Sequence, residues 1–155
     1  MNVILFRHGI AEPHGARADD DARVLTDEGK RKMKEIAPAL ARVFPKAEAL
    51  YSSPLPRCMQ TAKFIAKAYD LAIEKLDILR PGSDPDALRK FLVAASEKKL
   101  IFVGHEPHLS AAMLHITGMH ADGHIELKKG GCYRVRWNGG AGVLEWMLPP
   151  RTFRR

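Results

Sequence analysis

The segment MNVILFRHGIAEPH (residues 1–14) carries the strongest structural signal, because an apolar run in it stops abruptly at Arg7-His8-Gly9. The run Val3–Phe6 has the length and the bounding glycine of a short buried strand. A guanidinium and an imidazole at the end of that strand would emerge together at one edge of a sheet. In open α/β sheets, ligands bind at this edge. The segment therefore predicts an α/β fold with a binding site where the first strand ends.

The rest of the chain alternates strand-like and helix-like segments, without an internal repeat or a linker. The segments expected are strands at 2–7, 47–52, 73–76 and 100–103, helices at 27–44, 55–69, 85–98 and 107–118, and further strands at 124–127, 132–137 and 143–148. Asn138-Gly139-Gly140 suits a hairpin between the last two. This order predicts a three-layer α/β/α sandwich whose central sheet is mostly parallel, with antiparallel C-terminal additions. We expect a single domain over residues 1–155.

Helix boundaries have recognisable capping signals. Thr26 is the expected N-cap of the first helix, and the acids that follow it suit the helix dipole. Asp84 is the expected N-cap of the third helix, with Pro85 at the first helical position. Pro38 lies within the first helix and predicts a kink or an early break.

Composition limits the class of protein. The 155 residues are 46% hydrophobic and 28% charged, which is ordinary for a soluble globular chain. No apolar stretch is long enough to span a membrane, and Arg7 and His8 interrupt the N-terminal run too early for a secretory signal. Cys58 and Cys132 match neither a disulfide framework nor a zinc pattern. We therefore expect reduced thiols and a cytoplasmic location.

The net charge of +7, from 25 basic and 18 acidic residues, bears on the partner. Such a charge can attract nucleic acid, anionic lipid or a phosphorylated partner. The bases are largely interleaved with acids, and no nucleic-acid-binding motif is present. We interpret the basic tail, residues 151–155, as a solvated terminus. The expected partner is a phosphorylated protein or small molecule, with neither nucleic acid nor membrane involved.

Two further segments place chemistry-bearing residues at strand-to-helix junctions. They are SSPLPRCMQTA (residues 52–62) and VGHEP (residues 103–107). With the first segment they supply two arginines and two histidines. A guanidinium stays charged and binds two phosphoryl oxygens at once, and a neutral imidazole is a good nucleophile near pH 7. The set predicts phosphoryl transfer without a metal ion or a cofactor.

The candidate residues have distinct expected roles. His8 would attack phosphorus, its other ring nitrogen held by a backbone carbonyl in the Gly9 loop, where glycine permits a tight turn beside the ligand. Arg7 and Arg57 would bind the phosphoryl oxygens. His105 would lie across the pocket and be protonated when a dianion is bound.

Further donors come from Ser52 or Ser53 and from the amides that open the next helix. Cys58 is not expected to be a phosphatase nucleophile, because a C-x5-R loop would need arginine at position 64, which is Phe64.

These segments resemble the histidine phosphatase superfamily, which has the phosphoglycerate-mutase-like fold. The matching signatures are R-H-G at 7–9, S-S-P-L-x-R-A-x-Q-T-A at 52–62 with Cys58 in place of alanine, G-H at 104–105 and L-T-x-x-G at 25–29. The short length and the R-H-G-x-A-E opening look most like the SixA branch, the phosphohistidine phosphatases. The resemblance implies that His8 is phosphorylated and that Arg7, Arg57 and His105 form the phosphate pocket.

One departure bears on the substrate. Mutases and many phosphatases of the superfamily carry a glutamate that protonates the leaving oxygen, but residues 76–84 lack its E-x-x-x-G pattern, as SixA-like chains do. An alkoxide needs a strong proton donor, whereas the imidazole of a phosphohistidine leaves more easily. The expected substrate is therefore phosphohistidine on a protein of a phosphorelay or phosphocarrier system. Glu106 is a candidate proton donor, and Glu12 and Asp77 are weaker ones.

Other functions stay open. One is a small-molecule phosphomonoesterase on the same fold, and another is a non-catalytic phosphate-binding regulatory module, against which the nucleophile His8 argues. A metal site is not expected from the remaining histidines: His105 to His108 is one residue short of H-E-x-x-H. Those remaining histidines are His14, His108, His115, His120 and His124.

Overall fold

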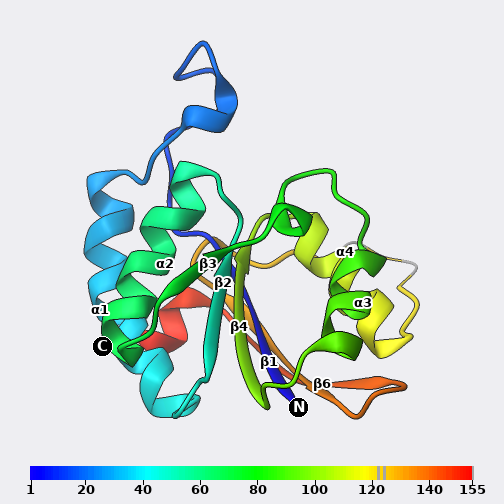
Figure 1. Ribbon diagram of the computed structural model, residues 1–155. Helices are drawn as coiled ribbons and strands as arrows, with labels where there is room; N and C mark the ends of the chain where they lie inside the picture. The colour runs from blue at the N-terminus through cyan, green and yellow to red at the C-terminus, as the bar shows by residue number, and fades with distance from the viewer. Residues whose placement is uncertain (122, 124, 155) are drawn as a thin grey trace.

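A computed structural model describes residues 1–121, 123 and 125–154, and these form one six-stranded sheet with helices on both faces (Figure 1). The strands are β1 (Asn2–Arg7), β2 (Ala49–Ser52), β3 (Ile73–Lys75), β4 (Lys99–Gly104), β5 (Cys132–Trp137) and β6 (Gly142–Leu148). The helices are α1 (Asp27–Val43), α2 (Pro56–Tyr69), α3 (Asp86–Ala94) and α4 (His108–Thr117), with 3-10 turns η1 (Asp20–Ala22), η2 (Asp77–Leu79) and η3 (Pro150–Phe153). None of these described helices is long and apolar enough to cross a membrane.

The strand order β3-β2-β4-β1-β5-β6 confirms a mostly parallel sheet with antiparallel C-terminal additions. Strands β1 to β4 pair in parallel, whereas β5 runs antiparallel to β1 and β6 runs antiparallel to β5. In the register of β1 and β4, Arg7 lies opposite Gly104. In the register of β2 and β4, Ser52 lies opposite Val103. The residues that follow each of these strands therefore leave the sheet together at one edge.

Two apolar clusters hold the layers together. Successive side chains of a strand point to opposite faces, so Ile4 and Phe6 pack toward α1 and α2, whereas Val3 and Leu5 pack toward α3 and α4. Figure 1 shows these helix pairs on opposite sides of the sheet. Because both faces are covered, β1 is a continuous apolar run rather than an alternating one. The expected three-layer α/β/α sandwich is confirmed.

Helix α1 begins as expected and does not break. The Thr26 hydroxyl accepts a hydrogen bond from the Gly29 amide at 3.0 Å, which confirms it as the N-cap. The early break expected at Pro38 does not occur, since the helix continues to Val43. Pro38 lies on the exposed face, where water can bind the carbonyl that lacks an amide partner, and the buried face opposite keeps the helix packed.

Two predictions for the third helix and one for a strand were wrong. Helix α3 ends at Ala94 rather than near residue 98, because the chain must return to the start of β4. Its N-cap is Pro85, and the Asp84 carboxylate instead accepts a hydrogen bond from the Asp86 amide at 3.0 Å. The strand expected at 124–127 is absent at 125–127, where the Leu127 carbonyl accepts from Arg7 instead of from a neighbouring strand; residue 124 lies outside the described residues.

The start of α1 packs against the loop that follows the first strand. The Thr26 amide donates to the Ile10 carbonyl at 3.0 Å, and a Cβ atom at Gly29 would lie 2.1 Å from the same carbonyl oxygen. Only glycine permits this approach, which fixes the loop carrying His8 and Gly9.

We predict that Gly29→Ala destabilises the protein by about 1–3 kcal/mol, because backbone atoms must move to admit the methyl group. Gly140→Ala is the matched control, since a Cβ there would meet nothing closer than 3.9 Å, and its effect should stay within about 0.5 kcal/mol. Urea denaturation of both variants measures the difference. Equal stabilities would show that the loop and the helix are not held as closely as described.

Candidate active site

A cavity of about 180 Å³ opens where β1, β2 and β4 end. It is lined by the two arginines and two histidines expected from the sequence, together with the candidate proton donor Glu106. Its lining residues are Arg7, His8, His14, Asp20, Asp21, Arg23, Arg57, Pro81, His105, Glu106 and Lys129. The cavity thus gathers groups that come from distant parts of the chain.

The His8 imidazole is held in one tautomer. Its Nδ1 lies 2.7 Å from the Gly9 carbonyl oxygen, which can only accept, so Nδ1 carries the proton and Nε2 keeps a lone pair. Gly9 in turn donates its amide to the Thr61 hydroxyl at 3.0 Å. Burial, followed by the charges of Arg57 and Arg7, lowers the pKa of His8 to about 3 against the opposing effect of the carbonyl. The imidazole is therefore neutral at pH 7, the form in which it can attack phosphorus.

His105 lies beside His8, with ring centroids 5.3 Å apart and ring planes inclined by 60°. Its Nε2 is 2.8 Å from the Ser53 hydroxyl and 3.4 Å from the Cys58 sulfur. Burial, and next the neighbouring His8 and Arg57, lowers the pKa of His105 to about 2, so this ring too is neutral at pH 7. Ser53 contacts His105 but does not line the cavity, which makes it a support for that ring.

Both expected arginines have guanidinium donors without a hydrogen-bond partner among the described residues. Arg7 donates Nη1 to the Leu127 carbonyl and to the Glu126 carboxylate, the latter at 2.8 Å. Arg57 makes only long contacts, 3.5 and 3.4 Å, with the carbonyls of Asp20 and Asp21. The Nε atoms of both arginines are buried without a hydrogen-bond partner among the described residues. Buried donors without partners are costly, and an anion in the cavity would satisfy them.

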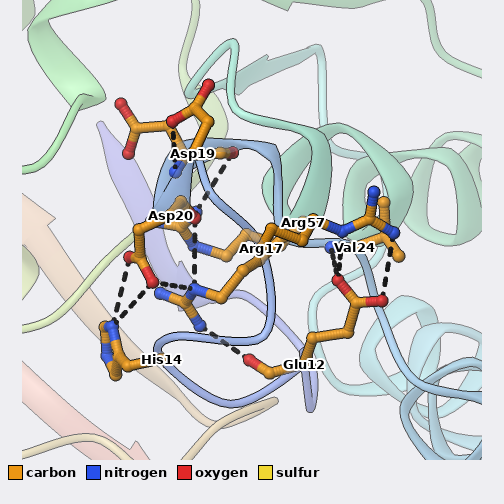
Figure 2. A network of polar contacts seen from close by, with 9 residues as sticks. Glu12, His14, Arg17, Asp19, Asp20, Val24 and Arg57 are labelled. Carbon is orange, nitrogen blue, oxygen red and sulfur yellow. Dashed lines mark hydrogen bonds and ion pairs between the residues drawn. The ribbon is translucent and has the colours of Figure 1, made fainter.

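In the loop between β1 and α1, the Asp20 and Asp21 carbonyls contact Arg57 (Figure 2), and both of these aspartates line the cavity. Asp20 accepts from His14 at 3.1 Å and forms an ion pair with Arg23 at 2.9 Å. Glu12 is engaged elsewhere in this network, by Arg17 at 2.6 Å. Glu12 therefore does not line the cavity, and as a proton donor it is poorly placed. Asp77 is likewise outside the cavity.

Glu106 lines the cavity, and one of its two carboxylate oxygens has a hydrogen-bond partner. Its Oε2 accepts from the Ser110 hydroxyl at 2.5 Å, and Ser110 in turn lies 2.8 Å from the Tyr133 hydroxyl. Its Oε1 is buried and has no hydrogen-bond partner in the described part of the chain. Burial raises the pKa of Glu106 above its ordinary value. A carboxyl group of this kind can carry a proton to a leaving group.

Several lining residues were not expected from the sequence, and Arg23 and Lys129 are the cations among them. The run KKGG at 128–131 is the one sequence signal for Lys129. Arg23 had no signal, since its position depends on how the loop folds. His115 and His120 line a different cavity, and His108 is buried away from this one. The structure shows no metal-binding group of three or more side chains in the residues it describes, and His124 lies outside them.

The buried cysteines do not contribute a nucleophile. Both thiols are free, and burial raises the pKa of Cys58 well above its ordinary value. The Cys58 sulfur contacts His105 and the Gly104 carbonyl instead. It packs where the related signature carries alanine.

Comparisons with known proteins identify the family. The family described as the histidine phosphatase superfamily (branch 1) matches residues 3–81. An uncharacterized protein of Picosynechococcus sp. is 33% identical over 167 residues, covering 96% of this chain and 100% of the relative. This relationship spans almost the whole chain.

Solved structures share the fold. The protein histidine phosphatase SixA complexed with tungstate superposes with a TM-score of 0.89 at 22% identity, covering 99% of this chain and 100% of that one. A mutant phosphoserine phosphatase from Entamoeba histolytica in complex with phosphoserine superposes with a TM-score of 0.77 at 17% identity, covering 97% and 98%. The family match and the sequence relative together establish the relationship: the chain belongs to the histidine phosphatase superfamily, branch 1, and is a phosphatase.

Proposed function

We propose that the protein removes phosphate from phosphohistidine on a partner protein, through a covalent intermediate on His8. The observation that carries the proposal is the hydrogen bond from His8 Nδ1–H to the Gly9 carbonyl. It fixes the tautomer, and burial keeps the ring neutral, so that Nε2 has a lone pair beside a cavity lined by Arg7, Arg57 and His105. A binding module would gain nothing from a nucleophile held in this form.

The reaction has two displacements at phosphorus. In the first, the His8 Nε2 lone pair forms a bond to phosphorus. The bond between phosphorus and the substrate imidazole breaks with its electron pair on the imidazole nitrogen, which takes up a proton from solvent. In the second, water attacks phosphorus, the bond to Nε2 breaks, and inorganic phosphate leaves with His8 neutral again. The transferring group carries its charge on three oxygens, so catalysis rests mainly on positioning and charge stabilisation. Arg7 and Arg57 supply that charge.

The leaving group supports phosphohistidine as the substrate. The segment 76–84 offers the cavity only Pro81, and its Asp77 is exposed and paired with Arg80 at 2.8 Å. A substrate imidazole needs less help from an acid than an alkoxide does. The net charge of +7 suits an acidic partner protein. We extend the proposal to a cytoplasmic location, for which the two free, buried thiols are the support.

A small-molecule phosphomonoesterase is the second candidate, and Glu106 is the observation that favours it. Its buried Oε1 and raised pKa suit protonation of an alkoxide. The two candidates share His8 and differ in their dependence on Glu106.

The first prediction concerns the covalent intermediate. Rapid mixing with a phosphorus-labelled phosphoramidate, followed by a denaturing alkaline quench, should trap label on the wild-type chain. His8→Ala should trap none and lose at least about a thousandfold in kcat, since removal of a catalytic nucleophile has effects of that order or larger. His115→Ala, in a separate cavity, is the control and should behave as wild type. Turnover retained by His8→Ala would end the proposal.

The second prediction separates the two substrate classes. Glu106→Gln should lower kcat for an alkyl phosphate by about a hundredfold, the usual size of a general-acid contribution, while kcat for a phosphoramidate changes less than about tenfold. Steady-state assays on both substrates with the same enzyme preparation give the comparison. Equal losses on both, or no loss on either, would show that Glu106 is not the proton donor.

The third prediction concerns pH. Burial lowers the pKa of His105, whereas the negative charge of a bound dianion should raise it, so binding should take up protons at pH 7. The affinity for tungstate should accordingly fall as pH rises. Calorimetry in two buffers of different ionisation enthalpy measures the uptake.

Two variants test whether His105 is the group that takes up the proton when tungstate binds. His105→Asn should abolish the uptake, whereas Glu106→Gln should retain it. Binding enthalpies that are independent of the buffer in the wild type would contradict a protonated His105 in the complex.

A further inference from the structure

The turn Lys128–Gly131 is fastened to the end of β1, the strand that leads to His8. The Gly130 amide donates to the carbonyls of both Arg7 and His8 at 3.1 Å, and the Arg7 amide donates to the Gly131 carbonyl at 2.9 Å. A further bond, 2.8 Å long, joins the Gly131 amide to the Lys128 carbonyl. These backbone contacts hold the turn in a fixed position beside the nucleophile.

The two glycines make this approach possible. Gly130 has φ of +81°, a conformation that other residues rarely adopt. A Cβ at Gly131 would lie 2.9 Å from the Leu148 carbonyl oxygen and 3.0 Å from that of Lys128. The run KKGG is therefore shaped to bring one lysine to the cavity at a defined place.

The lysine that reaches the cavity is Lys129, and its charge is not neutralised there. Arg7 and Arg23 are paired with Glu126 and Asp20. Lys129 forms neither an ion pair nor a hydrogen bond with any residue in the described ranges, although Asp20, Asp21 and Glu106 also line the cavity. Lys128, its neighbour, is exposed and does not line it.

The surroundings of Lys129 favour an anion. Burial, followed by the charges of Arg7, Arg23 and Arg57, lowers its pKa against the opposing charge of Glu126. A phosphoryl dianion would replace this repulsion with attraction, and an ammonium group offers three donors to its oxygens. Lys129 thus places an unpaired ammonium group beside His8, where a phosphoryl group can bind to it.

We propose that Lys129 is a phosphate-binding residue of the active site, whose ammonium group donates to an oxygen of the phosphoryl group in the substrate and in the released phosphate. This inference rests on the proposed function for the identity of the reaction. Its own test is anion binding, which needs no turnover.

The experiment compares Lys129→Met with Lys128→Met, a matched control one residue away. Calorimetric titration with inorganic phosphate should show binding about ten- to hundredfold weaker for Lys129→Met, the loss of one hydrogen bond between charged groups. Lys128→Met should bind as wild type. Lys129→Gln, a second neutral variant, should match Lys129→Met, and Lys129→Arg should recover part of the affinity. Thermal melting confirms that each variant is folded.

Kinetics on a small phosphoramidate extend the test. The kcat/KM of Lys129→Met should fall by a factor similar to the loss of phosphate affinity, whereas that of Lys128→Met should not change. Phosphate binding at wild-type strength by folded Lys129→Met or Lys129→Gln would overturn the inference. If wild type turned over no phosphorylated substrate while Lys129→Met still lost phosphate affinity, the proposed function would fail and the binding role of Lys129 would stand.

Discussion

Parallel pairing between β1 and β4 sets Arg7 opposite Gly104, and the candidate active site depends on this register. The residue after each strand is a histidine, so the two imidazoles leave the sheet side by side with ring centroids 5.3 Å apart. A slip of one residue would send these side chains to different faces of the sheet. Apolar side chains on both faces of β1 oppose such a slip, because it would exchange the residues that face α1 and α2 for those that face α3 and α4.

The cavity accumulates positive charge that the protein only partly neutralises. Some cations are paired, as Arg23 is with Asp20, while Arg57 makes long contacts with carbonyls. Buried donors without partners cost free energy, which a bound phosphoryl group would return. Burial, followed by the neighbouring charges, keeps His8 and His105 neutral. Burial thus favours both the proposed nucleophile and the binding of an anion beside it.

Much of the fold follows from local patterns. Buried strands are continuous apolar runs, and Thr26 and Gly118 mark helix ends through hydrogen bonding and backbone conformation. Predictions failed where long-range contacts override such patterns. Pro38 did not break its helix, because packing of the opposite face maintains it. Residues 125–127 have strand-like composition, but the Leu127 carbonyl bonds to Arg7, 120 residues away in sequence.

From the sequence alone came the proposed reacting groups and the sheet edge at which they meet, because a residue at the end of a buried strand has little freedom in where it emerges. Arg7, His8 and His105 were identified in this way, and Arg57 from the first turn of the helix that follows β2. Only the tertiary structure decided what surrounds them: Arg23 in a loop folded over Arg57, Glu106 bonded to Ser110, and Lys129 on a turn bonded to β1. The position of a loop residue depends on contacts made across the chain, and no local pattern encodes those.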